Sequence, residues 1–588
     1  MNVSPTKILC VALVAIPLVF PRTTTLAQEP SVPTPSVLDT KPFNYPNPKD
    51  DTENREDISI GELEAIDVES IGLLAEGDGG LGADLWNRSD RHQVEMLVSQ
   101  IPTKIRSRAG HNLLKLLVLS STRPPKKNGN SLDFLQVRLK VLVDLGEFES
   151  FVELLSKVPD NAITEDIKKL NTDVLLLMGD IETGCKVVDS QVQHGESLYW
   201  QKALFICQLM NGETARAALT LSLLREQNDD LDTGFLELGS LSLGEISALS
   251  TALTPNALNF ALLLGTEEHI PEHWLLHAGP AIQRAIAESA TIPLATRLVA
   301  AEHAAEMGAF SATDVGRLYR LMKFNEDELD NAITVAERMG GAMGRALLHQ
   351  ASRQKQKFEQ RAALLLASWG NSLTTGNVIL AALVNNESFL TLPIDNQIAY
   401  GAPQISRALL ASGSTEEFQL WLNFIDESAE IDAIFDNVLS SLMPLVVITK
   451  VDTARSWYPQ LAERWWNTIP ISDTTGASRN LEQANRLFVI LDALGYTISQ
   501  SGWNLLLGGP TVVTTKVPSV SIRYSLNKAA KTKQLGSTIL FCLLALGEGG
   551  PVEAGPLALG SVLRSLRHVG LENHAQALAF EALVENGL

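Results

Sequence analysis

The sequence is poor in cysteine and in aromatic residues. Its 588 residues include four Cys, and Phe, Trp and Tyr together make up 6%. So few cysteines in so long a chain exclude a small disulfide scaffold, while 45% apolar and 20% charged residues exclude a disordered or collagen-like chain. Leu and Ala dominate and β-branched runs are few, which favours helices over sheet. The length exceeds one ordinary core, so we expect several domains or an elongated array.

Long hydrophobic runs are also lacking beyond the N-terminus. There, a 13-residue apolar run, residues 8–20, follows the basic Lys7, and small residues at Thr25 and Ala27 suit signal peptidase. A membrane span takes about 20 residues, so this run is short for an anchor. We predict a signal peptide at residues 1–27 and a periplasmic or secreted protein with no integral membrane span. A retained N-terminal anchor is the alternative.

Basic residues are the minority among the charged ones. Lys and Arg number 47 against 68 Asp and Glu, which gives a formal net charge of −21. Nucleic acid and anionic lipid are recognised by basic faces, so an acidic surface repels both. We therefore expect a protein or a cell-envelope component as the partner, and no nucleic acid.

Three cysteines remain after the predicted cleavage site: Cys185, Cys207 and Cys542. In an oxidising compartment an odd count leaves one free thiol or one that pairs with another chain. Cys185 and Cys207 are 22 residues apart and could meet between adjacent helices. They could equally be two buried small apolar residues.

Residues 28–80 differ from the rest of the chain in charge and in proline content. They hold 13 acidic residues against three basic ones, with six Pro before residue 50. Such a composition predicts a solvated, disordered acidic linker. Leu85 and Trp86 follow it, and we expect them to be pinned onto the folded body.

A glycine followed by an acid recurs after the linker at nearly constant spacing. The intervals are 33, 33 and 32 residues, at Gly146-Glu147, Gly179-Asp180, Gly212-Glu213 and Gly244-Glu245. This period is the length of a two-helix repeat, the glycine suits a left-handed turn, and the acid suits the start of the next helix. We predict an all-α fold in which residues 81–345 form a tetratricopeptide-like α-solenoid of helical hairpins.

The remainder continues as helices with one interruption. We predict a continued helical array at 346–505, an irregular basic segment at 506–535 and a C-terminal helical cap at 536–588. The middle of these three segments contains several Val residues and basic residues from Lys516 to Lys533.

Two stretches are similar to a known group of proteins. They run from Glu69 to Trp86 (ESIGLLAEGDGGLGADLW) and from Tyr199 to Gln227, which begins YWQKALFICQ. They resemble an uncharacterised exported family of alphaproteobacteria with tetratricopeptide-like repeats, whose members often carry automatic labels such as antifreeze protein or antifreeze glycopeptide. The resemblance implies a periplasmic helical-repeat protein and supplies no catalytic residues.

The antifreeze label does not fit the residues. An ice-binding glycopeptide would need a simple Ala-Ala-Thr repeat, and an ice-binding solenoid needs Thr in a regular ladder. This sequence has isolated Thr clusters such as residues 23–25 instead. We therefore expect no antifreeze activity.

Two groups of residues suggest binding chemistry. His273 and His277, four apart on one helix face, could hold zinc with a third ligand, but His273 is not followed by the Glu of an HExxH motif. Trp457, Trp465 and Trp466 could stack on a glycan, or they could be core between repeats. We assign no catalytic residue, metal ligand or cofactor-binding residue.

One acid suggests catalysis. Glu387 in Asn-Glu-Ser-Phe is faintly similar to the Glu-Ser motif of lytic transglycosylases, in which a Glu protonates the glycosidic oxygen. The Gly-Leu-Met-Gln part of that motif is missing. The function that we predict is a non-enzymatic periplasmic helical-repeat scaffold that binds a protein or envelope partner. The alternative is a peptidoglycan-acting envelope hydrolase with Glu387 as its acid.

Overall fold

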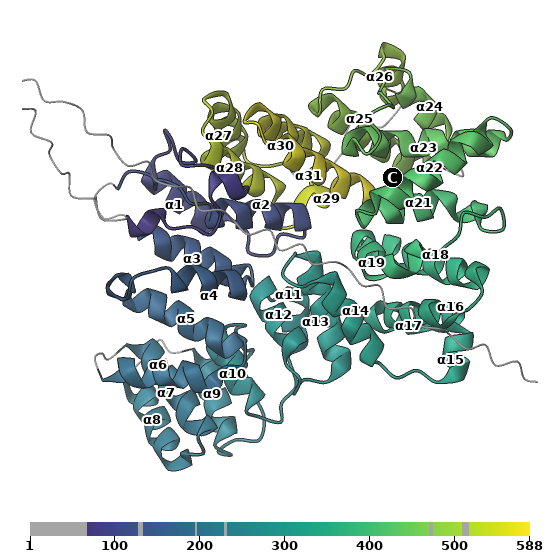
Figure 1. The fold of residues 1–588 in the computed structure, drawn as a ribbon. Helices are drawn as coiled ribbons and strands as arrows, with labels where there is room; N and C mark the ends of the chain where they lie inside the picture. The colour runs from purple at the N-terminus through teal and green to yellow at the C-terminus, as the bar shows by residue number, and fades with distance from the viewer. Residues whose placement is uncertain (1–66, 128–132, 194–196, 228–231, 470–473, 508–516) are drawn as a thin grey trace, which may run out of the picture. The chain divides into compact units, whose positions relative to one another are not determined.

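The computed structural model describes residues 67–127, 133–193, 197–227, 232–469, 474–507 and 517–588, all within one compact unit. These residues form 31 α-helices and four short 3-10 helices, and the described ranges contain no strand (Figure 1). The all-α prediction is therefore confirmed. The predictions for residues 1–66, including the signal peptide and most of the linker, lie outside the described residues.

The first part of the chain folds into helices that pack on their neighbours in sequence. They are η1 (Val68–Ser70), η2 (Glu76–Asp78), α1 (Arg91–Gln100), α2 (Arg108–Leu119), α3 (Phe134–Asp144), α4 (Phe148–Ser156), η3 (Asp160–Ala162), α5 (Glu165–Leu177), α6 (Ile181–Val192), α7 (Leu198–Met210), α8 (Thr214–Gln227) and α9 (Thr233–Ser242). Helix α3 contacts α4, α5 contacts α6, and α7 contacts α8. This region is therefore built of consecutive helix pairs.

A left-handed glycine joins the two helices of each pair. At Gly179, where φ is 78°, the Asp180 N–H donates to the carbonyl of Leu175 at 2.9 Å and the Gly179 N–H to that of Leu176 at 3.1 Å. These two bonds define a Schellman turn, which satisfies carbonyls left free at a helix end. The same pair of bonds recurs at Gly146, Gly212, Gly244 and Gly308. The spacing in the sequence thus reports a repeated turn.

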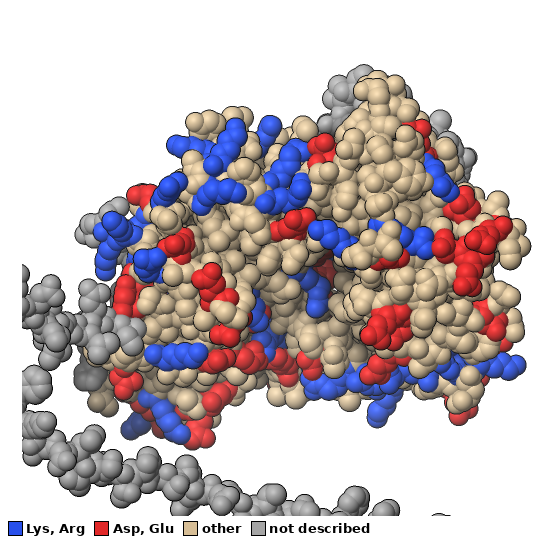
Figure 2. Space-filling view, turned by 45° about the horizontal axis from the view of Figure 1, so that its top comes forward, with Lys and Arg blue, Asp and Glu red and all other residues tan. Residues whose placement is uncertain are grey.

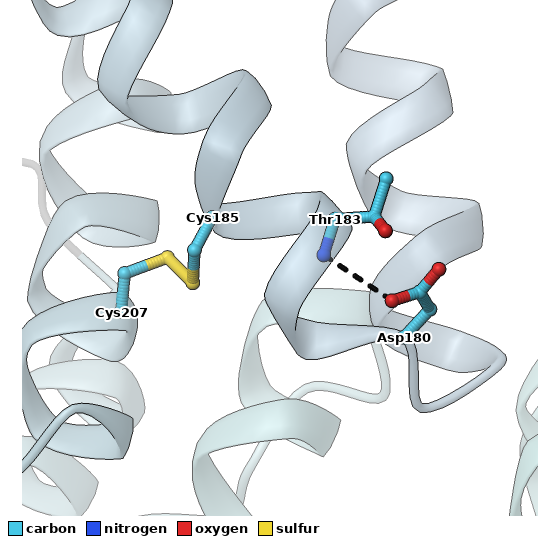
Figure 3. Close-up of a disulfide and its surroundings, with 4 residues drawn as sticks. All are labelled: Asp180, Thr183, Cys185 and Cys207. Atoms are coloured by element: carbon cyan, nitrogen blue, oxygen red, sulfur yellow. Dashed lines mark hydrogen bonds between the residues drawn. A yellow bond between two sulfur atoms is a disulfide. The ribbon is translucent and has the colours of Figure 1, made fainter.

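The acid after the glycine begins the next helix at most of these junctions. Asp180 precedes α6 and accepts the Thr183 N–H at 3.2 Å (Figure 3). Glu147 holds the same place before α4. After Glu245, however, the next helix begins only at Ala257. The prediction is wrong at that fourth junction, because the chain continues there as a loop.

Replacing Gly179 with Ala is expected to lower the free energy of unfolding by about 1 kcal/mol, because a Cβ is strained at positive φ. A Cβ there would meet no atom within 4 Å, so strain alone is tested. Gly370 is the matched control: it is exposed within a helix, also without nearby atoms and without a positive φ. Gly370→Ala should raise stability by up to about 1 kcal/mol. Chemical denaturation measures the free energy of unfolding of both variants. An equal change in the two would contradict backbone strain at position 179 as the cause.

The middle and the end of the chain continue in the same helical style. The helices are α10 (Ala257–Leu264), α11 (Glu272–His277), α12 (Pro280–Glu288), α13 (Leu294–Glu306), α14 (Ala312–Leu321), α15 (Glu326–Asp330), α16 (Ala332–Met339), α17 (Gly341–Gln354), α18 (Phe358–Thr375), α19 (Val378–Val384), α20 (Asn386–Leu390), η4 (Ala399–Gly401), α21 (Ala402–Ala411), α22 (Thr415–Ala429), α23 (Ala433–Thr449), α24 (Leu461–Asn467), α25 (Thr474–Ala493), α26 (Gln500–Leu506), α27 (Val520–Lys531), α28 (Leu535–Leu546), α29 (Gly550–Glu553), α30 (Pro556–His568) and α31 (Glu572–Val584). Small residues carry much of the packing. In α13, for example, four Ala side chains are fully buried.

Helix α27 corrects the prediction of an irregular segment at 506–535. Ser519 accepts the Ile522 N–H at 3.3 Å and so caps the helix, while Leu526 and Ala529 are buried against α28 and α30. The β-branched residues at its start suggested extended chain, but capping and packing outweigh that propensity. Residues 508–516 of the predicted segment lie outside the described part.

The end of the predicted acidic linker is also ordered. Glu69 forms an ion pair with the buried Arg91 at 2.8 Å and accepts the Phe134 N–H at 2.9 Å. Leu85 and Trp86 are buried, as expected, and the Gly536 N–H donates to the Leu85 carbonyl at 3.0 Å. For residues 67–80 the prediction of disorder is therefore wrong, because specific partners in α1 and α3 hold this acidic stretch.

The two ends of the described chain pack together. Helix α2 contacts α28 and α31, and α1 contacts α28 (Figure 1). Helix α31 also contacts α19, α23 and α25. Residues 536–588, which we predicted as a C-terminal helical cap, are helical in the structure. Their helices contact both the first helices and the middle ones, and α31 has buried apolar side chains toward them.

No helix within the described residues combines the length and the apolar character that a membrane span requires.

Candidate functional site

A cavity of about 640 Å³ lies where distant parts of the chain meet. The lining residues come from the loop after α1, from α11 to α13 and from α17. Others come from the turn between α18 and α19, from residues 517–518 before α27, and from the end of α28 to α29. The charged and polar lining includes Lys104, Arg106, His277, Gln283, Glu302, His303, Glu306, Arg345, Asn377, Glu548 and Glu553. Of these residues, only His277 is among the candidate binding residues predicted from the sequence.

A buried ion cluster forms one wall of this cavity. Arg345 of α17 donates from Nε to Glu302 Oε1 at 2.9 Å and from Nη2 to Oε2, and the Tyr319 hydroxyl also donates to Glu302. All three side chains are nearly inaccessible. Burial lowers the pKa of Arg345, but the hydrogen bonds and charge of Glu302 outweigh this and hold its pKa above the usual range. The cluster therefore ties α13, α14 and α17 together.

Glu306 lies one helical turn beyond Glu302. Its carboxylate is 3.3 Å from Arg106 Nη2 and accepts from Asn377 Nδ2 at 3.3 Å. Burial raises its pKa to about 7, although Arg106 opposes the change. An acid that is partly protonated at neutral pH and lines a cavity can donate a proton or a hydrogen bond to a bound molecule.

A second cavity of about 310 Å³ shares Arg106, Glu306 and Asn377 with the first. Two carboxylates border it, Glu581 in α31 and Glu585 directly after α31. Glu581 accepts from the Ser107 hydroxyl at 2.6 Å and from the Arg108 N–H at 2.9 Å, at the start of α2. Carboxylates at helix N-termini satisfy free amides and the helix dipole.

Glu585 caps the N-terminus of α19 in the same way. It accepts the N–H groups of Val378 and Ile379, each at 2.9 Å. Burial raises the pKa of Glu585, and it raises that of Glu581 to about 7. Since two carboxylates at the end of the chain cap α2 and α19, they hold the beginning, middle and end of the described chain together.

The histidine pair lies partly at the cavity. His273 Nε2 is 2.8 Å from the Leu253 carbonyl, while the exposed His277 lines the cavity. Within the described ranges, no three His, Cys, Asp or Glu side chains are arranged to hold a metal ion. The third ligand that a zinc site would need is therefore not among the described residues.

Glu387 lies on the surface at the start of α20. Its side chain is 78% exposed and accepts from Arg353 Nη1 at 2.6 Å. This hydrogen bond lowers the pKa of Glu387. A general acid for glycoside cleavage needs a raised pKa and a place beside the substrate. Glu387 instead has a lowered pKa and an exposed position on the surface.

The three tryptophans belong to the packing between helices. Trp465 is buried and its ring lies 6.3 Å from that of Phe488, while Trp457 donates from Nε1 to the Thr497 carbonyl at 2.7 Å. Trp457 and Trp466 are partly buried against the same core. They support the core interpretation rather than an exposed stacking platform.

A disulfide joins Cys185 of α6 to Cys207 of α7, and Figure 3 shows it linking two successive helix pairs. This settles the alternative that the sequence left open. Cys542 is free and fully buried, and burial raises its pKa. A disulfide fits an oxidising compartment.

Comparison of the chain with protein-family models, with curated proteins and with solved structures found no match.

Proposed function

We propose that this chain is an exported periplasmic scaffold, belonging to the exported family named above, that binds a protein or cell-envelope component without catalysis. The observation that carries the proposal is the Schellman turn repeated at the 33-residue interval, because repeated helix pairs are typical of tetratricopeptide-like solenoids. Such arrays bind partners along extended surfaces built from many repeats. The disulfide between two of the repeats supports an oxidising location.

Exposed apolar side chains on the second helix of a repeat give the first place to test. Leu219 and Leu223 of α8 lie one turn apart, and Leu219 is 63% exposed. Val152 of α4 is likewise exposed. Apolar side chains that gather on one face favour contact with another protein.

The test is affinity capture from an envelope extract with the exported protein, followed by purification of the captured component and measurement of its Kd. Leu219→Ser with Leu223→Ser is expected to weaken binding about tenfold, a loss of about 1.4 kcal/mol. Ile431→Ser, at an exposed residue far from these repeats in sequence, is the matched control. A component bound equally by all three proteins would contradict the proposed surface, and no saturable binding would contradict the scaffold.

One observation favours a second candidate, a hydrolase that acts on peptidoglycan. Glu306 combines a raised pKa with a place in the cavity, as a glycosidic general acid must. If this candidate is right, the protein cleaves peptidoglycan and Glu306→Gln abolishes cleavage, while Glu387→Gln does not. Absence of cleavage by the unaltered protein would eliminate the hydrolase and leave the scaffold.

The mature protein should begin at Gln28, which N-terminal sequencing of the exported protein measures. An intact Met1 in the membrane fraction would contradict export by a cleaved signal.

A further inference from the structure

Helix α27 carries an unusually one-sided set of charges for this acidic chain. Between Asp492 and Glu548 the sequence holds five basic residues and no acidic one. Three of the five, Arg523, Lys528 and Lys531, are exposed on α27. Within the described part of the chain, no ion pair with an acid is found for these three. Figure 2 shows Lys and Arg side chains gathered on one part of the surface with few acids among them.

Apolar side chains lie among these charges. Val520 is 81% exposed and Tyr524 is 67% exposed, one turn apart at the start of α27. Val517, just before the helix, is exposed as well, and it also lines the 640 Å³ cavity. The opposite face, with Leu526, Ala529 and Ala530, is buried against α28 and α30. The outer face of α27 is thus both basic and apolar while the helix itself is firmly held.

We infer that this outer face, which we call the α27 surface (Val517, Val520, Arg523, Tyr524, Lys528 and Lys531), docks on an anionic phospholipid bilayer. Basic side chains beside exposed aliphatic and aromatic ones are typical of helices that lie in a membrane interface. Tyr is enriched at that depth, where its ring is buried and its hydroxyl hydrated. An acidic peptide would satisfy the charges but gives no reason for the exposed Val pair.

The net charge of the whole chain does not prevent this contact. Charges are screened over about 8 Å at physiological ionic strength, so a bilayer responds mainly to the face that approaches it. The expectation that an acidic surface repels anionic lipid therefore fails locally at α27. The inference rests on the proposed function only in naming an envelope component as a partner, and vesicle binding is measured independently of the capture experiment.

The test is cosedimentation of the exported protein with vesicles of phosphatidylcholine and phosphatidylglycerol, against vesicles of phosphatidylcholine alone. We expect binding to the anionic vesicles only, weakening as salt is raised. Each basic residue near such a surface contributes about 1 kcal/mol, so replacing Arg523, Lys528 and Lys531 with Gln should reduce partitioning on the order of 100-fold. Tyr524→Ser should reduce partitioning several-fold, because the aromatic ring can no longer insert into the membrane interface.

The matched control neutralises three exposed basic residues elsewhere, Lys140, Lys186 and Arg216 on α3, α6 and α8. It changes the net charge equally and should leave partitioning unchanged. Equal loss in both triple variants would overturn the inference, since the effect would then belong to the net charge. Equal binding to both kinds of vesicle would also overturn the inference. So would a protein that binds polyglutamate through the same three residues but does not bind vesicles.

Discussion

Replacing Glu302 with Leu is expected to lower the free energy of unfolding by about 3–5 kcal/mol, because it leaves the Arg345 guanidinium buried without its counter-charge. Arg345 is 8% exposed and Glu302 3% exposed. Two hydrogen bonds join them, and Tyr319 adds a third to the same carboxylate. Removing one member of such a buried pair costs more than the pair itself contributes. Urea denaturation of the two proteins measures the difference.

The double variant separates the lost pair from the stranded charge. Glu302→Leu combined with Arg345→Met should recover most of the stability, since buried ion pairs can be exchanged for apolar residues of similar volume at little cost. Tyr319 then retains a buried hydroxyl without its acceptor, and adding Tyr319→Phe should recover about 1 kcal/mol more. A single Glu302→Leu variant that costs less than about 1 kcal/mol would mean that water in the cavity solvates Arg345.

The repeat was predictable from the sequence because it depends on local chemistry. A Schellman turn needs a residue in the left-handed conformation, and a glycine provides one at each interval, at Gly146, Gly179 and Gly212. The helical character of residues 536–588 was likewise predicted from the sequence, and α28 to α31 lie there. Helix α27 was not, because its start is rich in β-branched residues and the packing that decides its conformation comes from α28 and α30.

The cavity was not predictable, because its members are far apart in the chain. Arg106, Glu306 and Glu581 meet through contacts between the first, middle and last helices, and a local period carries no information on such contacts. One signal was present. Glu581 is a single charge within an otherwise apolar stretch, Ala-Phe-Glu-Ala. A lone acid on an apolar helix face suggests a buried partner, and this pattern could have identified Glu581.

A Glu581→Gln variant is expected to gain stability relative to the unaltered protein as the pH rises from about 5 to about 8. Burial raises the pKa of Glu581 from 4.5 to about 7. Between these two values the unfolded chain has released the proton and the folded chain retains it, so stability falls with rising pH. Above about pH 7 the unaltered protein has lost the full stability difference, which is on the order of 3 kcal/mol. The Gln variant shows no such loss, because Gln does not titrate.

Comparing the two proteins at each pH removes the other titrating groups from the result. Burial lowers the pKa of His349 to about 4, so His349 alone would make the fold more stable as the pH rises, and it would mask Glu581 in the unaltered protein. Glu387→Gln is the control: its pKa is lowered by Arg353, so its titration lies below this pH range and its stability difference should stay constant. Guanidinium denaturation of the three proteins across the range provides the measurement. A Glu581→Gln difference that is flat with pH would mean that the amides at the start of α2 and the Ser107 hydroxyl keep this carboxylate ionised despite its burial.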